Sequence, residues 1–229
     1  MAPEERTLKL PRATARALPT SWWAGNGLGM TDFTDLAREK DDEPKGPGGM
    51  ARVARDLLEK QRTLFISEEV SPKLTRRIVP SLLWLDSQSD DPIRLFINTP
   101  GGSADDGFAI HDAIRFVRSP VLCITNGLNA SAGTVILLST PKDYRFALPN
   151  SRIMIHQPSS GVRGKASDIL TTATEINKLR HRMNVLIGQE CDRSPEQVAE
   201  DTKGDCWMSP EEALGYGLIG KILTSLSDL

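Results

Sequence analysis

Two side chains with complementary chemistry, Ser131 and His156, stand 25 positions apart in this chain. Ser131 lies in Asn-Ala-Ser-Ala-Gly, where a segment typical of a strand gives way to one typical of a helix. His156 closes the apolar run Ile153-Met-Ile, which is typical of a strand. A serine hydroxyl is a poor nucleophile until an imidazole takes its proton, and the imidazole needs a third group to orient it. The pair therefore predicts a hydrolytic site.

Backbone N–H groups that can stabilise a developing oxyanion are expected at two places. Ser131 precedes an apolar helix over residues 134–139, and the first N–H groups of a helix are unpaired. A serine that only caps the helix fits the same position, and Asn129 replaces the first glycine of the GxSxG pattern. The segment Ile97-Asn-Thr-Pro-Gly-Gly102 offers a second donor, because glycines let the chain approach a substrate without a Cβ. A tight surface turn fits those letters as well.

Few other histidines compete for the role of base, because the chain has three in all. His111 and His181 lie in helical stretches and are predicted on helix surfaces. No pair among the three has the spacing of metal ligands, so no metal site is predicted.

The acid that orients the histidine is less sharply defined by the residues alone. Asp143 is the only acid between Ser131 and His156, which leaves too little chain for the serine–acid–histidine order of an α/β-hydrolase. Among the acids that follow, Asp201 and Asp205 share one loop. The bare sequence does not choose between them.

Strand-like and helix-like segments alternate along most of the chain, which predicts an α/β fold with a parallel sheet and right-handed crossovers. The expected strands cover residues 63–67, 93–97, 121–125, 144–148 and 152–156, and the expected helices cover 72–86, 105–117 and a long 167–190. Two short helices follow, each opened by a predicted capping box, Ser194-Pro-Glu-Gln197 and Ser209-Pro-Glu-Glu212. Residues 218–223 are expected to return as a strand.

Composition limits the class of protein. The 229 residues fit one domain, residues 50–229, and a flexible N-terminal extension, residues 1–49, that is rich in proline and glycine and is a candidate for removal by processing. A net charge of −2 does not indicate the basic surface that binds nucleic acid, and the apolar runs are too short to span a membrane. Three widely spaced cysteines and the absence of a secretory signal favour a cytoplasmic protein with reduced thiols.

Four motifs in order resemble the proteolytic subunit of the ATP-dependent Clp protease. They are Ile97-Asn-Thr-Pro-Gly-Gly102, Gly127-Leu-Asn-Ala-Ser-Ala-Gly133, Leu148-Pro-Asn-Ser-Arg-Ile-Met-Ile-His-Gln-Pro158 and Met208-Ser-Pro-Glu-Glu-Ala-Leu-Gly-Tyr-Gly-Leu218. The resemblance extends over about residues 55–224. The histidine-to-aspartate separation of 49 positions between residues 156 and 205 also fits that family's pattern.

The resemblance implies a serine endopeptidase that cuts unfolded proteins through an acyl-enzyme. Its implied catalytic residues are Ser131, His156 and Asp205; its implied oxyanion hole is formed by the N–H groups of Gly102 and Ala132; Gly101 and Ser103 are implied to bind substrate. It further implies a crotonase-like α/β fold with a protruding handle helix, and a homo- or hetero-oligomer of two stacked heptameric rings. The implied partner is an AAA+ unfoldase ATPase, and no metal or organic cofactor is expected.

Two alternatives remain open at this point. The chain departs from the family's pattern at Gly204, where an arginine is usual, which favours a non-catalytic structural subunit of a mixed ring. A crotonase-type acyl-CoA hydratase or isomerase would share the fold and the paired N–H groups, but such an enzyme works through carboxylates near the oxyanion hole.

Overall fold

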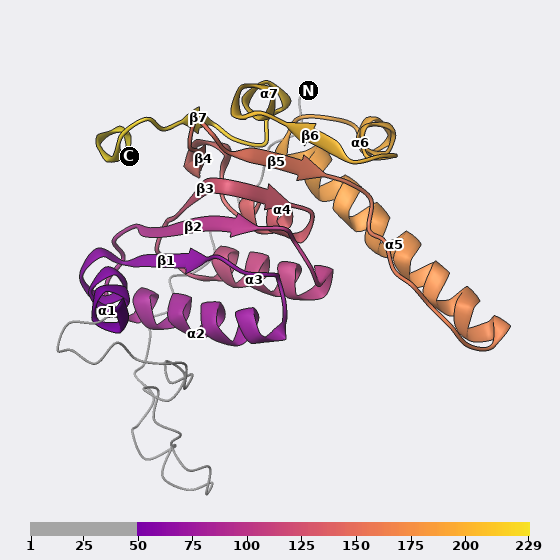
Figure 1. The fold of residues 1–229 in the computed structure, drawn as a ribbon, viewed down its shortest axis with the longest axis horizontal. Helices are drawn as coiled ribbons and strands as arrows, with labels where there is room; N and C mark the ends of the chain where they lie inside the picture. The colour runs from indigo at the N-terminus through magenta and orange to yellow at the C-terminus, as the bar shows by residue number, and fades with distance from the viewer. Residues whose placement is uncertain (1–49) are drawn as a thin grey trace, which may run out of the picture. The chain divides into compact units, whose positions relative to one another are not determined.

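The computed structural model of the protein describes residues 50–229, so the expected extension over residues 1–49 lies outside the described residues. Strands and helices alternate along the chain (Figure 1), which confirms the expected α/β class. The strands are β1 (Thr63–Ile66), β2 (Ile93–Thr99), β3 (Val121–Ala130), β4 (Arg145–Ala147), β5 (Arg152–Ile155), β6 (Cys206–Met208) and β7 (Lys221–Ile222). The helices are α1 (Met50–Gln61), α2 (Pro72–Gln88), α3 (Ala104–Phe116), α4 (Ala132–Leu137), α5 (Ala166–Glu190), α6 (Pro195–Asp201) and α7 (Pro210–Tyr216), with 3-10 turns η3 (Lys142–Tyr144) and η4 (Leu226–Asp228).

The seven strands form one sheet in which the order β1-β2-β3-β4-β7 is parallel throughout. The sheet forks at β3. Residues Cys123–Thr125 of this strand pair with β4, whereas residues Leu128–Ala130 pair with β5. β6 pairs with β5 antiparallel, and among the described residues β5 is its only partner. The fork brings the ends of β2, β3 and β5 to the same side of the sheet.

The expected end of the third strand near Thr125 is wrong. β3 continues through Gly127–Ala130, because its second half has its own partner in β5. Gly127 adopts a φ of 97° where the strand changes partners, a value that side chains other than glycine rarely allow.

The core lies between the sheet and the two helices α2 and α3, which cover one face of it (Figure 1). In β2 the buried residues alternate with half-buried or exposed ones, as the pleat of a strand requires. The buried side chains of β2 pack in one cluster with the apolar stripe of α2, formed by Leu74, Ile78, Leu82 and Leu85. α2 also continues as one helix across Pro80, where the sequence predicts a kink.

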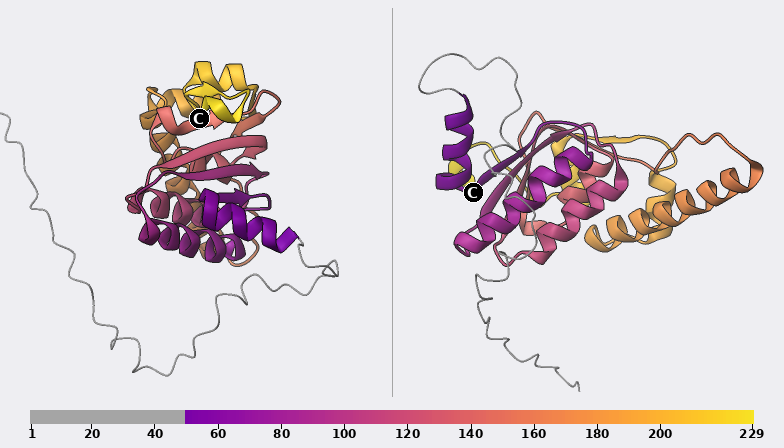
Figure 2. Two further views of the ribbon diagram at one scale, coloured as in Figure 1. Left: turned by 90° about the vertical axis from the view of Figure 1, so that its left-hand side faces the viewer. Right: turned by 90° about the horizontal axis from the view of Figure 1, so that it is seen from below.

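α5 is a helix of 25 residues that projects away from the sheet, as both figures of the whole chain show (Figure 1 and Figure 2, right). Its buried residues, Met183, Asn184, Ile187 and Gly188, all lie near its C-terminal end. The preceding half carries exposed apolar side chains, and Leu170 is 70% exposed. The expected long helix is confirmed. In the described residues no helix is long and apolar enough to cross a membrane.

The two short C-terminal helices begin as predicted, but one capping box differs. At α7 Ser209 and Glu212 exchange both hydrogen bonds of the box, and Gly217 ends the helix with a φ of 99°. At α6 Ser194 accepts the N–H of Gln197, whose side chain instead bonds to another residue, Asp201. The expected return of residues 218–223 as a strand holds only for the two residues of β7. Neither α1 nor β6 was predicted from the sequence.

A buried cation fastens the base of α5 to the sheet. Arg145, the first residue of β4, is 1% exposed and donates to the carbonyl oxygens of Thr140 at 2.7 Å and Glu190 at 3.1 Å. Its guanidinium also forms an ion pair with the Glu190 carboxylate. β4 and the last residue of α5 are thereby held together.

We predict that Arg145→Met lowers the free energy of unfolding by about 3–5 kcal/mol, because it leaves the largely buried Glu190 carboxylate without its main partner. Urea titration of the variant and the wild type measures this difference. The matched control is Arg115→Met, since Arg115 lies 3.5 Å from the same carboxylate but is 54% exposed, and its loss costs about 0–1 kcal/mol. Equal losses in the two variants would contradict the anchoring role of Arg145.

Candidate active site

Ser131 stands in a strained turn between β3 and α4. Its φ of 55° and ψ of −120° are rare for a residue with a side chain, and such strain is typical of functional turns. Two hydrogen bonds fix the turn against β5: the Ser131 N–H donates to the Met154 carbonyl at 3.0 Å, and the Thr134 hydroxyl donates to the same oxygen at 3.1 Å. The Ser131 side chain forms no capping hydrogen bond to α4. It is therefore not an ordinary N-cap serine, and its hydroxyl is available elsewhere.

The hydroxyl of Ser131 meets the imidazole of His156. The distance from Oγ to Nε2 is 2.8 Å, and the other ring nitrogen, Nδ1, lies 3.1 Å from Oδ1 of Asp205. Both contacts are satisfied when Nδ1–H donates to the carboxylate and the serine hydroxyl donates to Nε2. The His156 side chain is 24% exposed, so solvent reaches it only partly. The three side chains form one hydrogen-bonded line from hydroxyl to carboxylate.

The register of β5 and β6 decides which aspartate reaches the histidine. Antiparallel partners are Ile153 with Met208 and Ile155 with Cys206, so the next pair in the same register is His156 with Asp205. Asp201 is engaged elsewhere, because it accepts the Tyr216 hydroxyl at 2.9 Å and the Gln197 side-chain amide at 2.7 Å. The choice between the two acids, open from the sequence alone, thus follows from the pairing of a three-residue strand.

The Pro-Gly-Gly turn after β2 lies against Ser131. A Cβ added at Gly101 would come within 2.6 Å of the Ser131 Cβ and 3.2 Å of the Ala132 nitrogen. Gly101 also has a φ of 95°, a conformation that glycine alone adopts readily. The two stretches of backbone proposed to donate N–H groups therefore touch each other at this point.

Backbone hydrogen bonds on the other side of the turn determine where Gly102 points. Val70 donates to the Gly101 carbonyl and accepts the Ser103 N–H, both at 2.8 Å, in a parallel bridge with Gly102. In such a bridge the N–H and carbonyl of the bridged residue face away from the partner. The backbone hydrogen bonds among the described residues use Gly101 and Ser103 but not Gly102. The exposed Gly102 is thus the residue of this turn whose N–H and carbonyl face outward.

The cysteines are poor nucleophiles by comparison. Burial raises the pKa of the Cys123 thiol to about 12 and that of Cys191 to about 11. Burial, with help from the carboxylates of Asp201 and Glu212, also raises the pKa of Cys206. All three thiols stay protonated near neutral pH, and the protonated thiol is not the nucleophilic form.

The remaining histidines lie outside this line. His181 is exposed on α5 as expected, but the expected surface position of His111 is wrong. The His111 ring is buried beside Phe108, with Nδ1 3.0 Å from the Asp112 carboxylate, and burial lowers its pKa. Nothing in the described part of the chain groups three or more His, Cys, Asp or Glu side chains as metal ligands would be grouped.

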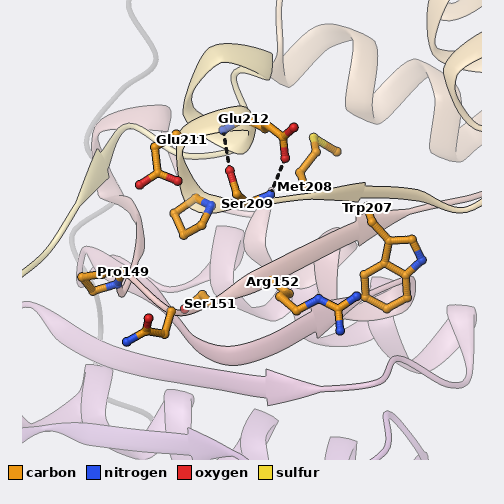
Figure 3. A pocket seen from close by; sticks show the side chains of 10 residues that line it. Pro149, Ser151, Arg152, Trp207, Met208, Ser209, Glu211 and Glu212 are labelled. Carbon is orange, nitrogen blue, oxygen red and sulfur yellow. Dashed lines mark hydrogen bonds between the residues drawn. The ribbon is translucent and has the colours of Figure 1, made fainter.

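A separate hollow of about 360 Å³ lies at the far end of the β5–β6 pair from His156 and Asp205 (Figure 3). Its walls come from Pro149–Arg152 and Trp207–Glu212. In it the Arg152 guanidinium lies 4.3 Å from the centre of the Trp207 ring. The hollow is open and contains neither Ser131 nor His156, so it is not part of the hydroxyl–imidazole–carboxylate line.

Comparisons with known proteins all find similarity to Clp protease. The family model described as Clp protease matches residues 49–226. The "ATP-dependent Clp protease proteolytic subunit 3" of Rhizobium meliloti is 42% identical over 200 residues, 87% of this chain and 100% of that protein. The "ATP-dependent Clp protease proteolytic subunit 2" of Treponema denticola is 44% identical over 73% of this chain and 84% of its own. A solved mutant ClpP1 from Listeria monocytogenes aligns with a TM-score of 0.71 and 38% identity, covering 76% of this chain and 98% of that one.

We predict that Gly101→Ala slows the reaction of Ser131 with a fluorophosphonate about a hundredfold, because the new methyl group forces the serine and the turn apart and a misplacement of about 1 Å costs that much. The rate of labelling in gel fluorescence measures the effect. Gly161→Ala is the matched control, since a Cβ at Gly161 meets nothing within 4 Å. Equal rates in Gly101→Ala and the wild type would show that the turn and the serine are not tightly packed in solution.

Proposed function

This chain belongs to the Clp protease family as a proteolytic subunit of the ATP-dependent Clp protease type, and from that premise we propose that it is a serine-type endopeptidase. In this proposal Ser131 is the nucleophile, His156 the general base and Asp205 the residue that orients the base. The observation that carries it is the continuous line of two hydrogen bonds, 2.8 Å and 3.1 Å, that joins these side chains.

The reaction follows from the polarity of that line. As the Ser131 oxygen bonds to the carbonyl carbon of a peptide, its proton passes to Nε2 of His156. The C–N bond then breaks, and the imidazolium returns the proton to the leaving amine, which leaves an acyl-enzyme. In the second half, His156 takes a proton from a water molecule whose oxygen attacks the ester carbon. The bond between that carbon and the Ser131 oxygen then breaks, His156 returns the proton to the serine oxygen, and the carboxylic acid product leaves. Asp205 keeps the proton on Nδ1 throughout and stabilises the imidazolium.

The N–H groups of Gly102 and Ala132 are proposed to form the oxyanion hole. Support comes from the outward-facing amide of Gly102, from the position of Ala132 directly after the nucleophile, and from the contact between the turn and Ser131. Two donors aimed at the developing negative charge stabilise the tetrahedral intermediate more than the planar substrate.

The substrate class is proposed to be unfolded polypeptide in extended form. A substrate strand would lie along Gly101–Ser103, on the edge of this segment that Val70 leaves open. Gly101 and Ser103 would shape this edge, while Gly102 would exchange hydrogen bonds with the substrate backbone. Recognition through main-chain groups admits many sequences, which suits a protease of broad specificity.

We propose that the chain works in a homo- or hetero-oligomer of stacked heptameric rings, in the cytoplasm, with an AAA+ unfoldase as its partner. The relatives are named as subunits, and the distal half of α5 exposes apolar side chains such as Leu170 that a second copy would cover. The stacked rings of Phe65 and Phe96, 5.5 Å apart on the helix-free face of β1 and β2, offer an apolar surface to the unfoldase. Residues 50–229 are proposed as the protease domain.

We predict that the wild type reacts with a fluorophosphonate and hydrolyses a short fluorogenic peptide. Ser131→Ala should abolish both the labelling and the hydrolysis. Removing the nucleophile of a serine hydrolase lowers kcat about 10⁶-fold. Peptide hydrolysis and labelling are measured on the assembled protein with and without a candidate ATPase. A wild type that is inert in every assembly state would instead favour the non-catalytic subunit. Activity on enoyl-CoA that survives Ser131→Ala would favour the hydratase.

We further predict that Asp205→Asn lowers kcat about 10⁴-fold, because an amide at this position favours the wrong tautomer of His156. Asp201→Asn is the matched control: Asp201 is the last residue of α6, shortly before Asp205 in the chain, and its carboxylate accepts hydrogen bonds from Tyr216 and Gln197. Its kcat should stay close to that of the wild type. Steady-state hydrolysis of one peptide by both variants decides, and a larger loss in Asp201→Asn would show that the wrong acid has been assigned.

A further inference from the structure

Thr99, the last residue of β2, has a buried hydroxyl that the proposed reaction does not use. The residue is 0% exposed. Its Oγ1 donates to the Glu68 carbonyl at 2.7 Å and accepts the N–H of Gly101 at 3.2 Å. Gly101 is itself buried, so its N–H needs an acceptor inside the protein, and this hydroxyl provides it. The hydroxyl therefore ties the Pro-Gly-Gly turn to the segment that follows β1.

The methyl group of Thr99 contacts the other half of the site. A Cβ added at Gly133 would lie 2.5 Å from Cγ2 of Thr99, so the methyl group packs directly on the first turn of α4. Gly133 immediately follows Ala132, whose N–H is the second proposed donor. A single side chain thus touches both pieces of backbone, one through its hydroxyl and the other through its methyl group.

We propose that Thr99 is a positioning residue whose hydroxyl holds the Gly101–Gly102 turn, and with it the N–H of Gly102, in place relative to the N–H of Ala132. The inference rests on the proposed function and adds a residue to it. Thr99 reaches no reacting atom; it acts through the turn at Gly101. Oxyanion donors work only when they lie about 2.7–3.1 Å from the charged oxygen, and a shift of about 1 Å costs about a hundredfold in rate. Loss of the hydroxyl should therefore lower kcat and leave KM nearly unchanged.

Two substitutions separate the hydroxyl from the methyl group. Thr99→Val keeps the shape of the side chain but leaves the buried Gly101 N–H without its acceptor, so the turn must shift. Thr99→Ser keeps the hydroxyl and removes the methyl group. Thr63→Val is the matched control, because Thr63 is 5% exposed and its hydroxyl donates to a backbone carbonyl, that of Gln61, at 2.9 Å. Thr63 is the first residue of β1 and lies at the amino ends of the parallel strands, whereas the turn lies at their carboxyl ends.

The experiment uses the full chain and measures kcat and KM for a short fluorogenic peptide. The concentration of active sites is determined by titration to completion with a fluorophosphonate, and kcat is calculated per active site. The affinity for a peptide boronate, which forms a tetrahedral adduct with the serine, is measured alongside. We expect Thr99→Val to lower kcat about tenfold to a hundredfold with KM within about twofold, and to weaken boronate binding by a similar factor. Thr99→Ser and Thr63→Val should stay within about threefold of the wild type in kcat.

Several results would overturn the proposal. A kcat for Thr99→Val close to that of the wild type would show that the hydroxyl is not needed for positioning. An equal loss in Thr99→Ser, or in Thr63→Val, would assign the effect to packing or general stability. Titration per active site removes the unfolded fraction from each comparison. An active wild type with an active Thr99→Val sinks this inference alone, whereas a wild type that neither labels nor hydrolyses sinks the proposed function and this inference with it.

Discussion

The pairing of β5 with the second half of β3 is the constraint on which the rest of the site depends. Ser131 is the first residue after β3, and His156 is the first residue after β5. Because these strands are parallel and adjacent, both residues emerge at the same edge of the sheet. β6 runs antiparallel to β5, so the residue before it, Asp205, reaches that edge too. The carboxyl edge of parallel strands is where open α/β sheets commonly bind ligands, and here strand order alone assembles the three groups.

Close backbone approach then fixes the main chain around Ser131. β2 ends at this edge as well, and its Pro-Gly-Gly turn presses on Ser131 so tightly that no side chain fits at Gly101. A side chain is equally excluded at Gly133, where a Cβ would lie 2.3 Å from Oδ1 of Asn129. Three hydrogen bonds to Val70 and Thr99 hold the turn from behind. Contact distance therefore requires glycine at both positions, and at Gly101 the φ of 95° requires it as well. This requirement joins the local sequence directly to the geometry of the proposed oxyanion hole.

The sequence predicted the parts that depend on local pattern and missed those that depend on tertiary pairing. Long periodic segments such as α2 and α5 were placed within a few residues, and Ser131 and His156, singled out from their flanking residues, lie within hydrogen-bond distance of each other. β6 has three residues, too few to show the alternating pattern of a strand. The choice between Asp201 and Asp205 as the partner of His156 needs the register of β5 and β6, which the sequence does not show. The continuation of β3 through Gly127 depends on a partner strand further along the chain. Burial of His111 was missed although the helical spacing indicates it, because His111 stands three positions after Phe108 and three before Ile114, on the buried face of α3.

The two ends of the hydrogen-bonded line are held very differently. Ser131 lies among buried glycines and two strands, whereas the Asp205 side chain is 57% exposed and contacts the His156 ring. β6 has a strand on one side only, and the loop before it is fastened to Gln157 through two hydrogen bonds of 3.3 Å, to the carbonyls of Thr202 and Lys203. Segments with few buried contacts open at lower free energy than the core. Asp205 is accordingly the member of the line that depends most on its surroundings, and Ser131 is the member that the fold itself secures.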